Sequence, residues 1–150
     1  MPATLAQINI SGGGMPKYPV PEAQLTFDGL AGDWQLDRKH HGGPGRAVCL
    51  YSLELYQVLR ELGVELTAGQ LGENLTTRGL DLMQLKPGDR LRVGGCIMEI
   101  TEARIPCASL DRWDPKLKQV MVDRPGWLAR VISEGMLHTG DTIRIISEDE

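Results

Sequence analysis

The chain of 150 residues is within the usual size of one domain and is long enough to bury a core without disulfide bonds or metal ions, so we expect a single domain over residues 1–150. Its 16 basic and 20 acidic residues give a formal net charge of -4, which argues against a broad surface for DNA or RNA. No segment approaches the roughly 18 to 20 consecutive apolar residues of a membrane helix, and the first residues lack a signal-peptide pattern, so we expect a cytoplasmic protein without a membrane partner.

Short β-rich segments separated by turn residues occupy the first third of the chain. Thr4 to Ile10 alternates as expected for a strand and is followed by three glycines in succession. A second β-rich run, Arg46 to Tyr51, follows the turn sequence Gly42-Gly43-Pro44-Gly45. These patterns predict two strands, each bordered by a glycine-rich turn.

One helix is predicted directly after the second strand, from Leu53 to Leu62. Ser52 is suited to the N-cap, Glu54 to the first turn and Gly63 to the C-terminal stop. Apolar residues recur at the i, i+3, i+4 and i+7 positions of one helical face, namely Leu55, Val58, Leu59 and Leu62. The segment therefore predicts an amphipathic helix.

Two similar segments mark the second half of the chain. Gly88 to Val93 and Gly140 to Ile145 both begin with a Gly-Asp turn and continue as alternating strands with aliphatic residues on one side. Between them, Ile97 to Thr101 and Trp127 to Ile132 predict strands, and Pro115 to Val122 predicts a short helix. The predicted fold class is therefore mainly β, a small closed or nearly closed β-barrel with one or two short helices and an acidic tail from about residue 147.

A basic, glycine-rich turn extends from Arg38 to Arg46. Two histidines, two arginines and a lysine surround glycines whose backbone N–H groups are able to converge on an anion such as phosphate. The alternative is a solvated basic turn, because basic loops outnumber phosphate sites. A zinc site is not favoured, since adjacent histidines such as His40 and His41 point in divergent directions and no partner ligands follow at metal-site spacing.

The three cysteines contain no C-x-x-C pair, which favours reduced thiols over a disulfide framework or a zinc site. Cys107 follows Pro106, which has no N–H to donate and tends to end the preceding strand. Nearby arginines, including Arg104, favour the thiolate, which is the form that acts as nucleophile or metal ligand. Cys107 is the candidate reactive thiol, with a buried structural thiol as the alternative, whereas Cys49 and Cys96 lie in β-rich runs typical of ordinary packing.

Two further segments are candidates for polar contacts with a ligand. Lys17 lies between prolines that stiffen the chain around a single cation, although a solvated lysine is the simpler interpretation. The segment Gly69 to Thr77 contains a carboxylate, an amide and hydroxyl groups, which suit either hydrogen bonds to a polar heterocycle or closure of the turn on itself.

Taken in order, these segments resemble the MOSC domain, named for the C-terminal region of molybdenum cofactor sulfurases, and the similarity extends over nearly the whole chain. Its first elements are Pro16-Lys17, Pro19-Val20, Gly32-Asp33-x-Gln35-x-Asp37, His41-Gly42-Gly43-Pro44, Ala47-Val48, Tyr51, Glu54 and Gly72-Glu73-Asn74-Leu75. The later elements are Gly88-Asp89-Arg90, Arg104-x-Pro106-Cys107-x-x-Leu110, Gly126-Trp127, Arg130-Val131 and Gly140-Asp141. Each motif is short, and their joint order carries the resemblance.

The resemblance implies a β-barrel with a cleft for the molybdenum cofactor (molybdopterin), in which the family's cysteine ligates molybdenum or carries sulfur as a persulfide. Cys107 occupies that position and is the implied catalytic residue and metal ligand. The residues implied to bind the cofactor are Lys17, His41, Gly42, Gly43, Arg46, Glu73, Asn74, Arg104 and Ser109. The chemistry agrees, because a thiolate is a soft metal ligand and a basic, glycine-rich turn suits a phosphate.

The length of the chain also sets an expectation about partners. It leaves no room for the pyridoxal-phosphate desulfurase domain of full sulfurases, so we expect no pyridoxal-phosphate site and, for a sulfur carrier, a cysteine desulfurase as the donor. We likewise expect neither the extra N-terminal region of the mitochondrial amidoxime-reducing component nor the C-terminal helical extension of bacterial proteins that resist N-hydroxylated bases.

Three functions remain open at this point. The first is a binding or carrier protein that holds the molybdenum cofactor, in which Cys107 ligates the metal or delivers persulfide sulfur to it. The second is a molybdenum-dependent reductase of N-hydroxylated compounds that receives electrons from an external electron-transfer protein, because the chain has no motif for a flavin, haem or iron–sulfur cluster. The third is a small barrel that serves as a binding module, in which Cys107 is structural; a single phenylalanine and the negative charge argue against a nucleic acid as its partner.

Overall fold

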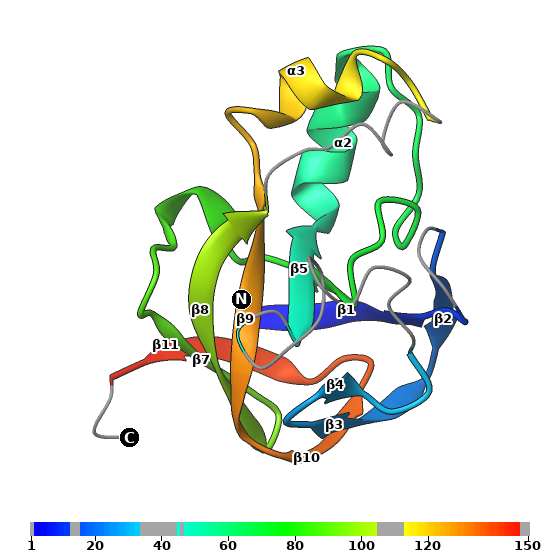
Figure 1. Ribbon diagram of the computed structural model, residues 1–150. Helices are drawn as coiled ribbons and strands as arrows, with labels where there is room; N and C mark the ends of the chain where they lie inside the picture. The colour runs from blue at the N-terminus through cyan, green and yellow to red at the C-terminus, as the bar shows by residue number, and fades with distance from the viewer. Residues whose placement is uncertain (1, 13–15, 34–44, 46, 105–112, 148–150) are drawn as a thin grey trace.

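The computed structural model describes residues 2–12, 16–33, 45, 47–104 and 113–147, and within these ranges it shows a β-barrel with two α-helices at one end (Figure 1). The strands of the larger sheet are β1 (Ala3–Ile10), β2 (Tyr18–Val20), β5 (Val48–Ser52), β6 (Leu75–Arg78), β7 (Arg90–Val93), β8 (Cys96–Arg104), β9 (Gly126–Ser133) and β11 (Thr142–Ile146). A smaller sheet contains β3 (Glu22–Thr26), β4 (Gly29–Leu30) and β10 (Gly135–His138). The helices are α2 (Leu53–Glu61), α3 (Leu117–Met121) and the 3-10 helix η2 (Leu82–Gln84).

The larger sheet closes into a barrel. Its strand order is β11-β7-β8-β9-β5-β6-β1-β2, and β11 also pairs with β1, where Ala3 is opposite Ile143 and Thr4 opposite Thr142. In the described residues, this pairing joins the two ends of the strand order and leaves β2 as an extension beside β1. The small barrel with one or two short helices that the sequence predicts is confirmed, with two α-helices in the described residues.

The helix α2 lies at one end of the barrel because of a crossover connection. Strands β5 and β6 are parallel, with Leu50 opposite Leu75, whereas the other pairs around the barrel are antiparallel. A parallel pair cannot be joined by a tight hairpin, so the chain leaves β5, forms α2 and returns to β6. The loop that leads back, residues 62–74, contributes several residues of the site described below.

The predicted helix is confirmed with its caps. Helix α2 begins after Ser52, whose side-chain oxygen accepts a hydrogen bond from the Leu55 N–H at 3.0 Å, and Gly63 after it has a φ of 94°. The helix ends at Glu61, one residue earlier than predicted, and the predicted second helix is shorter, Leu117–Met121. Such differences of one or two residues at helix ends are ordinary.

The two similar Gly-Asp segments form neighbouring strands. Strand β7 follows Gly88-Asp89, β11 follows Gly140-Asp141, and the two strands are antiparallel partners with Arg144 opposite Arg92 and Ile143 opposite Val93. Their aliphatic residues Leu91, Val93 and Ile143 are buried in the barrel interior, as the alternation predicts, but Ile145 is exposed and Ile146 is buried instead, so the alternation ends after Arg144. The arginines therefore point to the outer surface.

Strand β8 is longer than predicted. The sequence indicates Ile97 to Thr101, but the strand continues to Arg104 because a register shift between Ile100 and Glu102 keeps it paired with β9. It ends two residues before Pro106, in agreement with the expectation that this proline ends the strand. This extension places Arg104 beside Gly126 at the start of β9.

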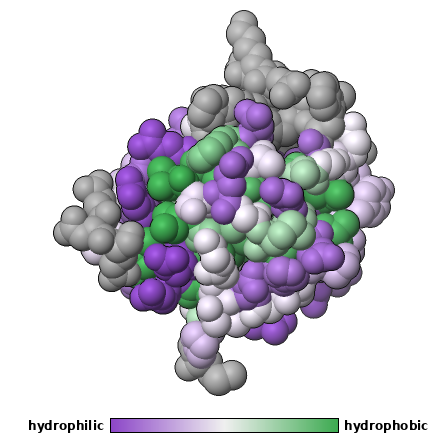
Figure 2. Space-filling view, turned by 90° about the horizontal axis from the view of Figure 1, so that it is seen from below, coloured by the Kyte–Doolittle hydropathy of each residue, from purple (hydrophilic) through white to green (hydrophobic). Residues whose placement is uncertain are grey.

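The described surface mixes hydrophobic and hydrophilic residues. Figure 2 shows this for the face seen from below, where apolar and charged side chains are interspersed. The large hydrophobic side chains that are exposed come from many elements: Tyr18, Phe27, Leu62, Met83, Val122, Met136 and Ile145. Within the described ranges, no helix has the length and apolarity needed to cross a membrane.

Candidate functional site

A buried ion pair joins two segments at one end of the barrel. The Lys17 ammonium lies 2.7 Å from Asp33 Oδ1 and 2.9 Å from Oδ2, and only 6% and 5% of the two side chains are exposed. Lys17 is therefore not the solvated lysine that was the simpler interpretation of the sequence. Its backbone N–H also donates to the Gly69 carbonyl at 2.9 Å, which fixes the segment before β2 against the loop between α2 and β6.

Asp33 connects several segments of this region, and no single sequence motif indicated this role. Besides Lys17, it accepts hydrogen bonds from the Ser11 N–H at 2.9 Å and from Asn74 Nδ2 at 2.9 Å. The Asn74 side-chain oxygen in turn accepts from the Cys49 N–H at 3.0 Å. One carboxylate thus holds together the end of β1, the segment before β2, the turn before β6 and, through Asn74, the start of β5.

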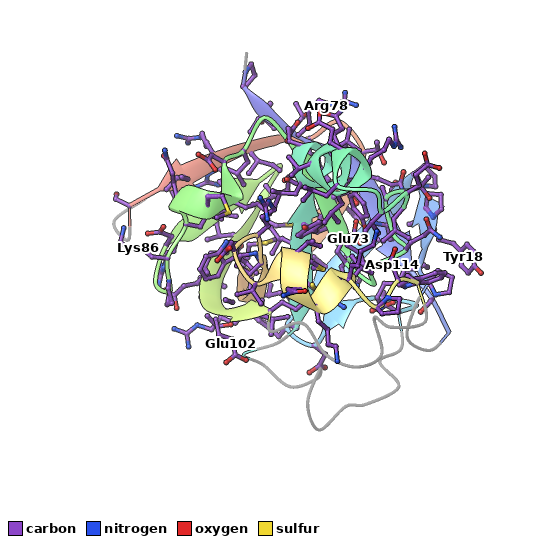
Figure 3. All side chains as sticks on the ribbon, turned by 90° about the horizontal axis from the view of Figure 1, so that it is seen from above. Tyr18, Glu73, Arg78, Lys86, Glu102 and Asp114 are labelled. Atoms are coloured by element: carbon purple, nitrogen blue, oxygen red, sulfur yellow. The ribbon has the colours of Figure 1, made fainter. Side chains whose placement is uncertain are left out.

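Glu73 lies in the interior beside α2, as the view from above shows (Figure 3). Its side chain is fully buried and accepts hydrogen bonds from the Tyr56 hydroxyl at 2.6 Å, the Gly69 N–H at 3.0 Å and the Thr76 hydroxyl at 2.8 Å. The bond from Gly69 closes the turn on itself, which is one of the two roles that the sequence allowed for this segment. Burial raises the pKa of the Glu73 carboxyl, and the three hydrogen bonds act in the opposite direction.

The raised pKa of Glu73 predicts a pH-dependent effect of Glu73→Gln. Because the folded protein binds this proton more tightly than the unfolded chain, the carboxyl lowers stability as the pH rises above the unfolded pKa of about 4.5. Glutamine mimics the protonated form, so Glu73→Gln should gain stability relative to the wild type between acid and neutral pH. Urea unfolding of both proteins from pH 4 to 7.5 measures this, and a difference that does not change with pH would contradict it.

Cys49 lies at the centre of the described charges. Its thiol is 3.8 Å from Arg104 Nη1, and the charges of Arg104, Glu73 and Lys17 all act on it. Burial is the largest influence and raises the pKa of the Cys49 thiol, with Arg104 opposing it. Burial likewise raises the pKa of Cys96. Both cysteines are buried free thiols, as their β-rich context predicts.

These environments predict an order of thiol reactivity. Since the thiolate is the reactive form, Cys49 and Cys96 should react slowly with iodoacetamide in the native protein, whereas Cys107 should react faster by about tenfold or more. Peptide mass spectrometry over a time course measures each cysteine separately, and the unfolded protein, in which all three should react alike, is the control. Equal protection of Cys107 in the native protein would contradict the prediction.

Four of the predicted site residues lie in the described part of the chain, and they come together. Lys17, Glu73 and Asn74 belong to the buried network around Asp33 and Gly69, and Arg104 reaches it through Cys49. The others lie outside the described residues: His41, Gly42, Gly43, Arg46, Cys107 and Ser109. We name Lys17, Asp33, Cys49, Glu73, Asn74 and Arg104 the polar cluster.

Asp33 and Cys49 belong to the polar cluster although the sequence did not single them out as site residues. Asp33 belongs to one of the motifs that carry the family resemblance. It also lies a few residues before the basic turn, and this position was the one feature of the sequence that could have identified Asp33 as a site residue. Nothing in the run that contains Cys49 distinguishes it from a core residue. In both cases the function of the side chain depends on partners distant in sequence.

The polar cluster suits an anionic, polar ligand better than a metal ion alone. Within the cluster, Arg104 is half-buried at the end of β8, while the carboxylates of Asp33 and Glu73 have their own donors. Among the described residues, no three His, Cys, Asp or Glu side chains gather as metal ligands. Of these residues, the Arg104 guanidinium is the group that would pair with an anion such as a phosphate.

The chain is similar to known proteins of other organisms. It is 32% identical to YflK of Bacillus subtilis over 143 aligned residues, which cover 91% of the chain, and 32% identical to YiiM of Escherichia coli over 154, which cover 97%. In both cases the match spans 65% of the relative's length. A "Reductase" of Gibberella moniliformis is 32% identical over 115 residues, or 71% of this chain and 20% of that protein.

Solved structures and a family profile lead to the same conclusion. The crystal structure of YiiM from Escherichia coli, 29% identical, superposes with a TM-score of 0.75 over 98% of this chain and 69% of that one. YiiM from Geobacillus stearothermophilus, 24% identical, shares the fold with a TM-score of 0.81 over 97% of this chain and 76% of that one. The profile of the MOSC domain matches residues 37–144. The chain therefore belongs to the MOSC domain family.

Proposed function

We propose that this protein binds the molybdenum cofactor beside the polar cluster, in the cytosol, with Cys107 as the thiol that ligates the metal or carries persulfide sulfur. The observation that supports this most is the position of the polar cluster at the C-terminal end of β8, because Arg104 ends that strand three residues before Cys107. The MOSC match covers both segments. A thiolate close to a guanidinium is the form that binds a soft metal.

The residues of the chain have separate roles in this proposal. Arg104 supplies a positive charge at the end of β8, and its hydrogen bond to Cys49 sets its direction. The ion pair with Lys17 fixes the position of Asp33. From Asp33 the chain continues toward His41, Gly42 and Gly43. When bound, the cofactor would supply a metal that changes oxidation state; the protein supplies orientation and charge.

The test is the molybdenum and pterin content of wild type and Cys107→Ser, each purified without added reductant from a host that makes the cofactor. We expect cofactor in the wild type and at least about a tenfold loss in the variant, because one soft ligand is replaced by a hard hydroxyl. Cys96→Ala, changed at the opposite end of β8, is the matched control and should retain cofactor.

The outcomes separate the two forms of the proposal. Wild type without cofactor but with a persulfide on Cys107, detected by intact mass, would support sulfur transfer with a cysteine desulfurase as the donor. Wild type with neither would contradict the proposal.

The basic turn provides a second prediction. Arg46→Glu and His41→Asp should lower cofactor content about tenfold while leaving the thermal midpoint within a few degrees, because each places a negative charge where an anion binds. Arg78→Glu, which changes an exposed arginine at the end of β6, is the control. Unchanged cofactor content in both variants would show that the turn does not take part in cofactor binding.

A reductase is the second candidate function, favoured by the similarity to the Gibberella moniliformis "Reductase". In such a reaction the N–O bond of an N-hydroxylated compound breaks, and two electrons and two protons produce the amine and water. An external electron-transfer protein would provide the electrons. Turnover of a hydroxylamine with dithionite-reduced viologen, present in cofactor-loaded wild type and absent in Cys107→Ser, tests this function.

A further inference from the structure

Strand β8 contains a β-bulge at Thr101. Ile100 is opposite Ala129 and Glu102 is opposite Leu128, so β8 has one more residue than β9 between these two pairs. Bulges of this kind redirect a strand and its side chains, and they occur often beside active sites. After the bulge, β8 continues to its last residue, Arg104 of the polar cluster. The bulge therefore precedes the part of β8 that contributes to the candidate site.

The hydroxyl of Thr101 joins two segments that are not neighbours in the sheet. It donates a hydrogen bond to the Gly45 carbonyl at 2.5 Å, and the Leu128 carbonyl is a second acceptor at 3.1 Å. Strand β9 lies between β8 and β5 in the strand order, and Gly45 comes shortly before β5 (Figure 1). The hydrogen bond to Gly45 thus reaches across β9. It holds the last residue of the turn sequence Gly42-Gly43-Pro44-Gly45 against β8.

The chain that enters β5 is also held from a second side. A Cβ atom on Gly29 would lie 2.6 Å from the carbonyl oxygen of Ala47, so the backbone of β4 lies directly against this buried residue. Gly29 has a φ of 121°, which favours glycine. At the other end of the segment 34–44, the ion pair with Lys17 fixes Asp33. Both ends of this segment are therefore attached to the barrel.

The contacts of Thr101 and of Arg104 meet on the outer side of β9. Arg104 Nη1 lies 3.8 Å from the Cys49 thiol, and Cys49 is opposite Leu128, whose carbonyl is the second acceptor of the Thr101 hydroxyl. Cys49 and Leu128 are buried but do not belong to the hydrophobic core cluster, which contains their neighbours along each strand. Because side chains alternate along a strand, both point away from the barrel interior. The end of the glycine-rich turn and the Arg104 guanidinium therefore lie near the same part of the outer surface.

We propose that Thr101 is a positioning residue of the candidate site, whose hydroxyl fixes the end of the basic turn where the turn and Arg104 act on one anion. The inference rests on the proposed function, which assigns an anion to the basic turn and a positive charge to Arg104. Thr101 acts through Gly45 and not on the ligand itself. Without the hydroxyl, anion binding has to order the chain before β5, which weakens binding. The net contribution of one hydrogen bond corresponds to about three- to tenfold in affinity.

The test compares Thr101→Val, which keeps the shape but loses the hydroxyl, with Thr101→Ser, which keeps the hydroxyl. Inorganic phosphate is the probe, and its affinity is measured by ³¹P NMR titration. Thr101→Val should weaken phosphate binding by about three- to tenfold, and Thr101→Ser should remain within about twofold of wild type. Thr139→Val removes a hydroxyl that donates to the Pro21 carbonyl at 3.3 Å; it is the matched control and should leave the affinity unchanged. Since valine is suited to a strand, the thermal midpoints should stay within a few degrees.

Trypsin cleavage after Arg46, followed by peptide mass spectrometry without any ligand, is the second measurement. Cleavage there requires the chain around Gly45 to leave β8, so its rate reports the local opening. Thr101→Val should be cut about three- to tenfold faster than wild type, and Thr101→Ser and Thr139→Val should be cut at nearly the wild-type rate.

The outcomes distinguish this inference from the proposed function. Equal phosphate affinity in Thr101→Val and wild type, or a loss that Thr101→Ser does not restore, would overturn the positioning role even if cleavage became faster. Molybdenum and pterin content of the same preparations is the independent measurement. A phosphate affinity that depends on Thr101 in protein without cofactor contradicts the proposed function alone, whereas cofactor in the wild type with unchanged phosphate affinity in Thr101→Val contradicts the positioning role alone. Wild type that binds neither phosphate nor cofactor contradicts both.

Discussion

Asp33→Ala should lower the free energy of unfolding by about 3 to 5 kcal/mol, because it leaves the Lys17 ammonium buried without its counter-charge. The substitution also removes the acceptor of the Ser11 N–H and of the Asn74 side chain. Since both side chains of the ion pair are about 95% buried, water does not replace the lost interactions. Urea unfolding at neutral pH measures the effect.

The double variant Lys17→Met with Asp33→Ala identifies the cause. If the isolated charge is responsible, removing Lys17 as well should restore part of the stability, so the double variant is more stable than Asp33→Ala alone. Lys86→Met, which removes an ion pair to Asp89 from a lysine side chain that is 77% exposed, should cost less than about 1 kcal/mol. Equal losses for the buried and the exposed pair would contradict this account.

Gly69→Ala should destabilise the protein by about 2 kcal/mol more than Gly88→Ala. The two glycines have nearly the same φ, 93° and 96°, so the cost of a side chain in the left-handed region is shared. They differ in their surroundings: a Cβ at Gly69 would lie 2.6 Å from the Lys17 carbonyl oxygen, whereas at Gly88 nothing lies within 4 Å. The difference between the variants therefore measures the close contact with Lys17.

The same pair of variants tests whether the polar cluster and the candidate site are connected. Displacing Lys17 moves the ion pair with Asp33, from which the chain continues toward the basic turn. Cofactor content should therefore fall in Gly69→Ala and remain near wild type in Gly88→Ala, at a temperature where both are folded. Unfolding in urea and molybdenum content measure the two effects, and identical behaviour of both variants would show that the contact has no influence.

Local patterns predicted the elements of the fold well, and their pairing less well. Ser52, the apolar face of α2 and Gly63 are neighbours in sequence, so the helix and its caps were predictable from propensity alone. The Gly-Asp segments predicted β7 and β11 as strands, but not that the two are hydrogen-bonded to each other. Pairing is decided by the closure of the whole barrel, which no short window contains.

The candidate site shows the same division. The sequence singled out Lys17 between prolines, Arg104 near Cys107, and Glu73 and Asn74 in a glycine-containing segment, and the family resemblance implied all four as site residues. Their partners were not predictable: Lys17 and Asp33 are separated by 16 positions and meet only because of the path through β2, β3 and β4. Two interpretations of the segment around Glu73 were open, and the hydrogen bond from the Gly69 N–H to Glu73 shows that the turn closes on itself.

Closure of the barrel by β11 against β1 sets a time order in the cell. The Leu5 N–H donates to the Asp141 carbonyl and the Gly140 N–H donates to the Leu5 carbonyl. Strand β1 therefore completes these hydrogen bonds only after residues more than 130 positions later have been translated. Until then β1 has a free edge, and the strands that hold the polar cluster have no closed support. Loading of a ligand that requires the closed barrel therefore follows translation of β11 and not only synthesis of the polar cluster.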